Sequence, residues 1–215
     1  MKNRFDLIIF DWDGTLMDSV DWIVHCIQRA AALYECPVPE TQAVKDIIGL
    51  SIEKAIAILF PDVNALNKQR IVKEYGQTFL SKHTSREDLF PGVYEMLLQL
   101  RQDGYRLAVA TGKKSKGLQQ AMSASGVTEL FCTTRSSDQT ASKPDPLMLN
   151  EIMAELDIPK QRTLMIGDSA HDLQMAKNAG IAAIGVTCGA HSAEVLELYN
   201  PIFCLDYPTD LLNFF

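Results

Sequence analysis

The 215-residue sequence has few cysteines, no long apolar run and no signal-like segment. Its five cysteines are an odd number without a Cys-x-x-Cys pair, so we expect buried, reduced thiols and neither a disulfide framework nor a zinc site. No apolar stretch approaches the ~20 residues that cross a membrane. The first apolar run, Leu7–Phe10, is too short for a signal peptide and is followed by acids. These absences predict a cytoplasmic protein without a membrane partner.

The sequence also lacks an excess of basic residues. Twenty Lys and Arg face 27 Asp and Glu, which gives a net charge of -7. Nucleic-acid backbones bind clustered Lys and Arg, so we expect no nucleic-acid partner. A small phosphorylated metabolite remains compatible with this charge, because one metal ion and one lysine can outweigh the distant field of the surface.

Two carboxylates follow the first apolar run. Asp11 and Asp13 are two residues apart, and Gly14 comes next. The run predicts a buried strand, and open α/β sheets bind ligands at the carboxyl ends of their strands. Close carboxylates repel each other, and Mg²⁺, which prefers oxygen ligands, removes that repulsion. Taken alone, this pattern also describes a strand that ends in solvated acids.

Two further apolar runs, residues 106–110 and 164–166, are also followed by polar residues, and a lysine before a proline lies between them. Taken singly, a threonine at a strand end serves a turn, and a lysine before a proline is solvated. The polar residues of interest in these segments are Thr111, Gly112, Lys143, Asp168, Ser169 and Asp172.

Together the four segments resemble, in order, the four motifs of the haloacid dehalogenase superfamily. Essentially the whole chain is similar to its phosphoglycolate phosphatase-like subgroup. The resemblance implies a Mg²⁺-dependent phosphatase that hydrolyses a small soluble phosphomonoester, phosphoglycolate or a sugar phosphate above all, through an aspartyl-phosphate. Relatives with the same core motifs leave open a β-phosphoglucomutase-like phosphotransferase or a phosphonoacetaldehyde hydrolase. A binding protein on a degenerate core is the non-enzymatic alternative.

The resemblance also implies a role for each motif residue. Asp11 is expected to be the nucleophile and Asp13 the general acid/base. An acid at position 13 speaks against a dehalogenase, because that branch generally lacks one there. The Thr111 hydroxyl and the Gly112 amide are expected to hold a phosphate oxygen. Lys143 is expected to offset the negative charge of the acids and the phosphate.

The same resemblance implies a metal site. Its expected ligands are the carboxylates of Asp11 and Asp168 and the backbone carbonyl of Asp13. Ser169 and Asp172 are expected to support this site from outside, the latter by binding a metal-bound water or by orienting the lysine.

The middle of the chain differs from both ends. Residues 17–86 hold one helical pattern after another and no convincing strand, whereas strands and helices alternate from Pro91 onward. We predict an α/β fold, a doubly wound (Rossmann-like) parallel sheet built from residues 1–16 and 87–215, with an inserted all-helical cap at 17–86. The alternative is a single layered α/β domain with several surface helices.

Within the expected cap, Gly49 and Leu50 resemble the loop that related phosphatases bring over the substrate. Lys54 lies one helical turn beyond. In phosphonoacetaldehyde hydrolases a cap lysine forms a Schiff base, so Lys54 is either such a residue or a solvated helix lysine. We expect these positions to act on substrate choice, and we expect a monomer or a homodimer.

Overall fold

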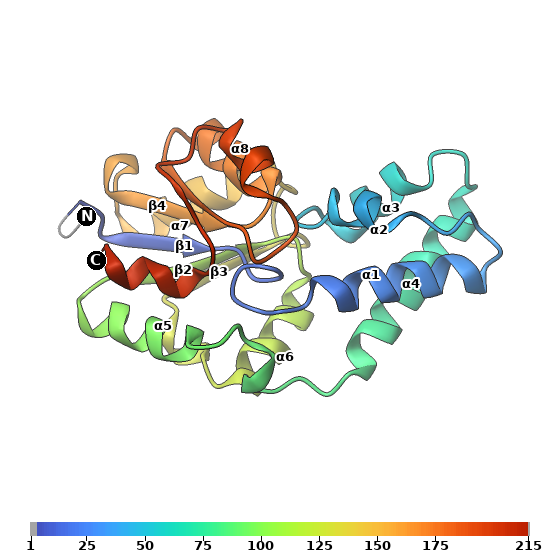
Figure 1. The fold of residues 1–215 in the computed structure, drawn as a ribbon, viewed down its shortest axis with the longest axis horizontal. Helices are drawn as coiled ribbons and strands as arrows, with labels where there is room; N and C mark the ends of the chain where they lie inside the picture. Colours follow the sequence, from blue (N-terminus) through green and yellow to red (C-terminus); the bar gives the residue numbers. More distant parts are fainter. Residues whose placement is uncertain (1–3, 215) are drawn as a thin grey trace.

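The computed structural model describes residues 4–214, and a six-stranded sheet forms its centre (Figure 1). All strand pairs are parallel, and the strand order is β3-β2-β1-β4-β5-β6. The strands are β1 (Leu7–Phe10), β2 (Arg106–Thr111), β3 (Thr133–Ser136), β4 (Thr163–Gly167), β5 (Ala182–Val186) and β6 (Cys204–Leu205). This order is that of Rossmann-type doubly wound sheets, so the predicted fold class is confirmed.

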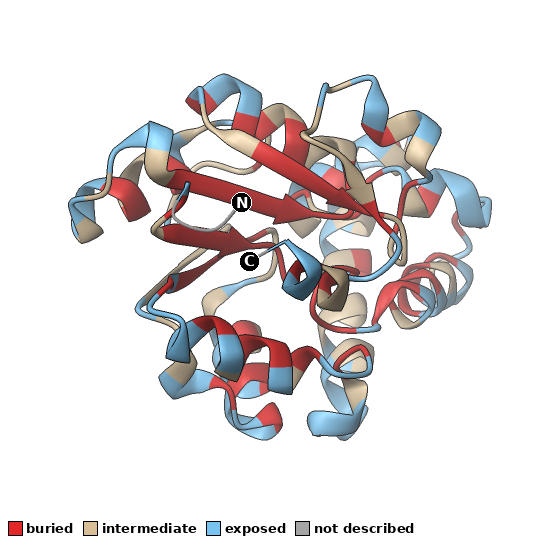
Figure 2. Cartoon of the chain, turned by 60° about the vertical axis from the view of Figure 1, so that its left-hand side comes forward, coloured by how far each residue is buried: buried red, intermediate tan, exposed pale blue. Residues whose placement is uncertain are grey.

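The apolar composition of β1 follows from its position at the centre of the sheet. It pairs with β2 on one side and β4 on the other, with Phe10 opposite both Val109 and Ile166. Helices cover both faces of the sheet, so all four β1 residues are buried, as Figure 2 shows in red for the middle of the molecule. A continuous apolar run is the pattern of such a strand.

Two helical layers enclose the sheet. One face packs against α5 (Val93–Gln102), α6 (Ser115–Ser125) and the C-terminal 3-10 turn η4 (Pro208–Asn213). The other face packs against α7 (Leu147–Leu156), α8 (Ala170–Ala179) and α9 (Ala193–Glu197). Alternate residues of β1 serve the two layers: Ile8 and Phe10 face the first, and Leu7 and Ile9 face the second.

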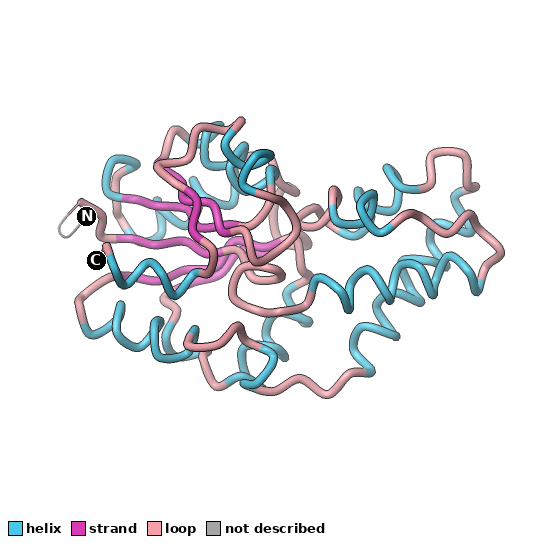
Figure 3. The backbone as a smooth tube through the Cα atoms, in the orientation of Figure 1, coloured by secondary structure: helices cyan, strands magenta, loops and turns pink. Residues whose placement is uncertain are grey.

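Between β1 and α5 the chain forms helices and no named strand, and these helices extend away from the sheet (Figures 1 and 3). They are α1 (Val20–Leu33), α2 (Thr41–Lys45), α3 (Ile52–Leu59) and α4 (Ala65–Ser81), followed by the 3-10 turn η1 (Arg86–Asp88). Their buried apolar residues form a separate cluster that includes a single side chain from the sheet-bearing part, Ala190. No helix in residues 4–214 is both long and apolar enough to cross a membrane.

The chain leaves and rejoins the sheet-bearing part at adjacent points. Asp18 N donates to Asp88 O at 2.9 Å, and Phe90 N donates to Leu16 O at 3.0 Å. Met17 and Leu89 form an antiparallel bridge between these two segments. Two neighbouring stretches of chain therefore join the helical segment to the sheet-bearing part, which is the geometry of an insertion.

Three details differ from the sequence-based expectations. Strands β3 and β6 were not predicted, because one is polar and half-buried and the other has two residues. Ser19 stands at the N-cap of α1 but makes no capping hydrogen bond, since its hydroxyl donates to Asp13 instead. All five cysteines are free, but only Cys26 and Cys36 are buried; Cys132 is exposed, and Cys188 and Cys204 are partly exposed.

Candidate active site

The motif residues meet at the carboxyl edge of the sheet, where the strand order reverses. Asp11 directly follows β1, Thr111 ends β2, and Asp168 directly follows β4. The backbone N–H of Asp11 donates to Ile166 O at 2.9 Å, which keeps the end of β1 beside the end of β4. The crevice beyond such a switch point is the usual ligand site of a doubly wound sheet.

Three buried carboxylates form a cluster there. One oxygen each of Asp11, Asp168 and Asp172 lies within 4.8 Å of the other two. The ammonium of Lys143 reaches the cluster from the loop before α7 and lies 2.7 Å from Asp11 Oδ1 and 2.5 Å from Asp172 Oδ1. None of the four side chains is more than 2% exposed. The structure thus brings together four of the predicted site residues.

Backbone and hydroxyl donors fix two of these carboxylates. Asp168 accepts from the Thr15 hydroxyl at 2.7 Å and from the Ala190 N–H at 2.8 Å. Asp172 accepts from the N–H and the hydroxyl of Ser169, at 3.1 and 2.6 Å, in a capping box that starts α8. Each carboxylate keeps one orientation because its donors belong to rigid segments.

The charges are strongly coupled. Burial raises the pKa of Asp11 well above its ordinary value, Asp172 adds to this, and Lys143 opposes it. Burial and Asp172 likewise raise the pKa of Asp168 to about 7, against the hydrogen bonds from Ala190 and Thr15. For Lys143, burial alone favours the neutral amine, but Asp11 and Asp172 reverse this and raise its pKa.

The cluster fits a divalent cation. Three carboxylates face one ammonium group, which leaves a formal charge of -2 when all are ionised. Asp11 Oδ1 is buried and has no hydrogen-bond partner, because its contact with Lys143 is close but poorly directed. Unsatisfied carboxylate oxygens in a buried cluster are the donor set that Mg²⁺ binds.

Asp13 lies beside the cluster and has a partner that the sequence analysis missed. The Lys113 ammonium lies 3.0 and 2.8 Å from the two Asp13 oxygens, and the Ser19 hydroxyl donates to Asp13 at 2.8 Å. The same ammonium lies 4.1 Å from the ring centre of Phe79 on α4. Lys113 follows Thr111-Gly112 directly, and that adjacency was the only signal available in the sequence.

Thr111 combines the two roles considered for it. Its hydroxyl oxygen accepts from the Lys113 N–H at 3.2 Å, which is turn chemistry. A hydroxyl can accept and donate at once, so its hydrogen remains available to a ligand. The side chain is 1% exposed and lines the same cavity as Asp11 and Asp13.

Comparison with known proteins agrees with this geometry. A family model described as haloacid dehalogenase-like hydrolase matches residues 8–186. The chain belongs to that family. It is 37% identical over 204 residues to the probable phosphatase IndB of Dickeya dadantii strain 3937 (93% of this chain, 89% of that protein). It is 32% identical over 219 residues to a phosphoglycolate phosphatase of Vibrio parahaemolyticus (96% and 94%).

A solved structure shares the fold. A putative haloacid dehalogenase-like hydrolase from Bacteroides fragilis has a TM-score of 0.87, with 24% identity, and the match covers 96% of this chain and 99% of that one. The chain described here is therefore an enzyme of the haloacid dehalogenase-like hydrolase family, and its curated relatives named above are phosphatases.

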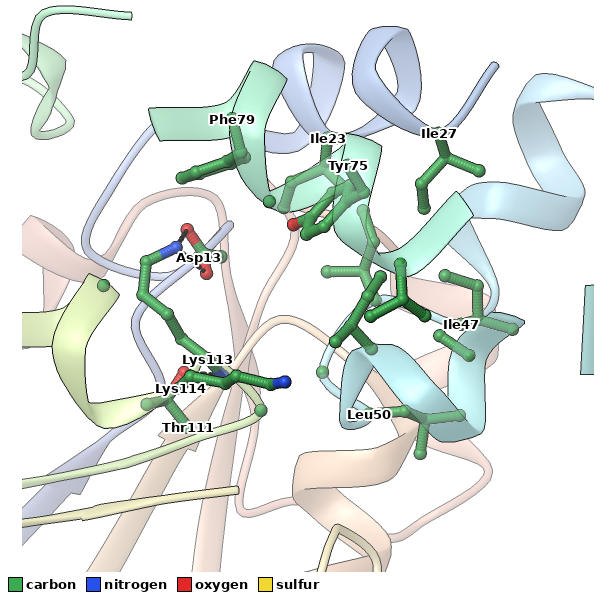
Figure 4. A pocket seen from close by; sticks show the side chains of 18 of the residues that line it. Asp13, Ile23, Ile27, Ile47, Leu50, Tyr75, Phe79, Thr111, Lys113 and Lys114 are labelled. Carbon is green, nitrogen blue, oxygen red and sulfur yellow. Dashed lines mark hydrogen bonds and ion pairs between the residues drawn. The ribbon is translucent and has the colours of Figure 1, made fainter. Parts of the chain in front are cut away.

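The cavity of this hydrolase lies between the sheet edge and the helical segment (Figure 4). Its volume is about 240 Å³. Polar residues form the floor, among them Asp11, Asp13 and Thr111, and residues of α1, α3, α4 and the loop before α3 form the roof. Gly49 and Leu50 line the roof.

The loop before α3 touches the sheet edge closely. A Cβ atom at Gly112 would lie 2.4 Å from the carbonyl oxygens of both Gly49 and Leu50. Gly49 has φ +98°, and a Cβ there would lie 2.8 Å from Ser169 Oγ. Further contacts across this boundary join Ser51 N to Ser142 Oγ at 2.9 Å and His171 Nε2 to Asp46 O at 2.9 Å.

The placement of Lys54 favours the solvated helix lysine over the Schiff-base residue, the two alternatives that the sequence left open. Its side chain is exposed, it is not among the residues that line the cavity, and its ammonium donates to the carbonyl of Lys143 at 3.2 Å. It thus joins α3 to the loop that carries the buried lysine.

Proposed function

We propose that this enzyme is a Mg²⁺-dependent phosphatase that hydrolyses a small soluble phosphomonoester through an aspartyl-phosphate. The observation that carries the proposal is the buried cluster of Asp11, Asp168 and Asp172, with Lys143, at the floor of a cavity of about 240 Å³. Phosphoglycolate and sugar phosphates are the substrates that the motif resemblance favours, and one relative is named for the former.

The first half of the reaction uses both acids of the β1 motif. A carboxylate oxygen of Asp11 attacks phosphorus, and the ester P–O bond breaks. Asp13 gives its proton to the departing oxygen, so an alcohol leaves. Phosphoryl transfer depends mainly on positioning and charge neutralisation, which Lys143, Thr111 and the Gly112 N–H supply around the phosphoryl oxygens.

The second half restores the enzyme. Asp13 takes a proton from water, and the water oxygen attacks phosphorus of the aspartyl-phosphate. The bond between phosphorus and Asp11 breaks, and inorganic phosphate leaves. Lys113 holds both Asp13 oxygens before substrate arrives. An incoming phosphate offers Lys113 a second anionic partner, which frees an Asp13 oxygen for proton transfer.

Asp11, Asp168 and the backbone carbonyl of Asp13 would hold the metal ion, with Asp172 and Ser169 behind them. The bound ion would supply charge neutralisation at the phosphoryl oxygens. Asp172 Oδ1 lies 2.5 Å from Lys143 Nζ and so holds the lysine ammonium toward the phosphoryl oxygens.

The helical residues 17–86 act in this proposal as a mobile cap. The paired linkers at Met17 and Leu89 provide a short hinge region, and Gly49 and Leu50 lie against Gly112 at the opposite contact. Closure of such a cap excludes water and strengthens the interactions of charged groups beneath it.

The direct test is phosphate release from a panel of phosphomonoesters by the purified protein with Mg²⁺. We expect turnover that EDTA abolishes, that Mg²⁺ or Mn²⁺ restores, and that Ca²⁺ inhibits, because Ca²⁺ accepts more ligands with looser geometry. Full activity after EDTA treatment would contradict the metal requirement. Transfer of the phosphoryl group to a sugar instead of water would favour a mutase.

The placement of Lys54 supports a phosphatase over a phosphonoacetaldehyde hydrolase. Lys54 is not among the residues that line the cavity, and its ammonium donates to the backbone carbonyl of Lys143, so a Schiff base with a carbonyl substrate would require that hydrogen bond to break. Lys54→Ala should therefore keep substantial phosphatase activity. A borohydride-trapped adduct at Lys54 with a carbonyl phosphonate would reverse this assignment.

A further inference from the structure

The roof of the cavity has a composition that the core motifs do not explain. The roof residues contributed by α1, by the segment before α3 and by α4 are mostly branched aliphatic side chains, and Figure 4 shows several of them directed into the cavity. Those that carry the argument are Ile23, Ile27, Ile47, Ile48, Leu50 and Val72. The first five are at most 7% exposed. A ligand group under this roof therefore exchanges water for apolar surface.

Cations line the cavity only on the sheet side, among the residues described. Lys113 is paired with Asp13, and Lys114 lies 2.5 Å from Glu53. Lys116 is exposed at the cavity's edge. A carboxylate placed against the isoleucines would thus be buried without a partner, which is strongly unfavourable. The roof disfavours a leaving group that carries a charge.

One polar side chain interrupts the apolar part of the roof. The Tyr75 hydroxyl makes no hydrogen bond among residues 4–214 that would occupy it, and Figure 4 shows it directed into the cavity on the side of Asp13. Burial, together with Asp13, raises the pKa of Tyr75 well above its ordinary value, so the group is a neutral hydroxyl. It is a single polar group that can donate a hydrogen bond to a ligand or accept one from it.

The volume limits the size of the ligand. An apolar protein cavity of about 150 Å³ holds a benzene molecule. The cavity here measures about 240 Å³, which leaves room for a phosphoryl group beside a group of about that size. A long chain or a nucleotide exceeds this volume and would have to extend out of the cavity.

We propose that the preferred substrate is a phosphomonoester of an uncharged, largely apolar alcohol of about the size of one ring, with at most one polar atom placed to meet Tyr75. The inference rests on the proposed phosphatase activity, and for its substrate it favours such an alcohol over the phosphoglycolate and sugar phosphates that the motif resemblance suggests. In this proposal the polar residues at the floor bind the phosphoryl group, and the apolar roof binds the alcohol part of the substrate.

Three primary alkyl phosphates test this selection: benzyl phosphate, ethyl phosphate and phosphoglycolate. All three release a primary alcohol, so differences in kcat/KM report mainly on how the cavity receives the rest of the molecule. We expect kcat/KM for benzyl phosphate to exceed that for the other two by about tenfold or more, since even one methylene in an apolar pocket is worth about that.

Gly76 provides a variant that changes the roof alone. It lies on α4, lines the cavity, and a Cβ atom there would meet nothing within 4 Å. Gly76→Leu should fill the apolar space and lower kcat/KM for benzyl phosphate by about tenfold, with a much smaller decrease for ethyl phosphate. Gln77→Leu places the same side chain at the next position of α4, which is exposed and outside the cavity. It should leave kcat/KM unchanged for both benzyl phosphate and ethyl phosphate.

The outcomes separate the two proposals. If no phosphomonoester is hydrolysed with Mg²⁺, the phosphatase proposal fails, and the substrate proposal with it. If phosphoglycolate has the highest kcat/KM, the enzyme is a phosphatase and the apolar-alcohol proposal is overturned. The same holds if Gly76→Leu lowers kcat/KM equally for all three substrates while thermal unfolding is unchanged. A larger loss for benzyl phosphate in Gly76→Leu than in Gln77→Leu supports it.

Discussion

At the scale of single residues, the site concentrates buried charge that its own lysine does not neutralise. Lys143 is fully buried and contacts Asp11 and Asp172, and removal of this one cation would leave buried carboxylates uncompensated, which typically costs about 3–5 kcal/mol of stability. The reverse holds for a surplus carboxylate, whose removal relieves repulsion. The acids of this cluster therefore lower the stability of the metal-free protein, and a cluster of buried acids with raised pKa values is typical of functional sites.

Asp11→Asn is the sharpest test at this scale. The amide keeps the shape of the side chain but removes the nucleophile, so we expect kcat to fall by about 10⁴-fold or more. The variant should still fold, and without metal its melting temperature should equal or exceed that of the wild type, because burial and Asp172 disfavour the charged form of Asp11. Steady-state kinetics and thermal unfolding in EDTA measure the two effects.

The two measurements belong together. A variant with lost activity and an intact unfolding transition assigns Asp11 to the reaction. Asp138→Asn is a matched control at a solvent-accessible acid that accepts hydrogen bonds from Ser115 and lies outside the cavity. It should leave kcat near the wild-type value. Near wild-type turnover in Asp11→Asn would remove the nucleophile assignment.

At the scale of elements, the sequence allowed prediction of the buried strands, because each of them is a continuous apolar run. The apolar patterns over residues 106–110 and 164–166 located β2 and β4, whose residues are almost all buried. Edge strands β3 and β6 have no apolar run because they are polar or very short. Lys113 was missed because its partners Asp13 and Phe79 are far from it in the sequence.

The contact between the β2–α6 turn and the loop before α3 could not be predicted for the same reason. A matched pair of glycine variants tests it. Gly112→Ala places a Cβ 2.4 Å from two backbone carbonyl oxygens, so the loop with Gly49 and Leu50 must move away. In Gly117→Ala the nearest atom is the flexible Lys113 side chain at 3.5 Å, an ordinary contact.

We expect Gly112→Ala to lower kcat/KM by about tenfold or more for every substrate, because a displaced cap loop admits water and misplaces the phosphoryl group. Gly117→Ala should stay within about threefold of the wild type in the same assay. The melting temperature separates loss of fold from loss of closure. Equal kinetics for the two variants would show that the contact has no role in turnover.

At the scale of the whole molecule, the proposed metal site would link metal binding to stability through the cluster. The pKa of Asp168 is about 7 in the folded metal-free protein, against about 3.9 in an unfolded chain. Between these values the folded state binds the extra proton, so this group lowers stability as pH rises through that window. A metal ion needs the carboxylate ionised, so its binding releases the proton and strengthens as pH rises.

The stabilisation by Mg²⁺ should therefore grow between pH 5 and pH 8. One proton contributes at most about 1.4 kcal/mol per pH unit, which for a protein of this size corresponds to about 3–6 °C in melting temperature. Thermal unfolding across this range, with Mg²⁺ and with EDTA, measures the difference. Asp168→Asn cannot titrate there and should show a smaller and flatter Mg²⁺ effect. A wild-type Mg²⁺ shift that stays constant or shrinks as pH rises would contradict the placement of Asp168 at the metal, because a ligand whose proton competes with the ion must produce the opposite slope.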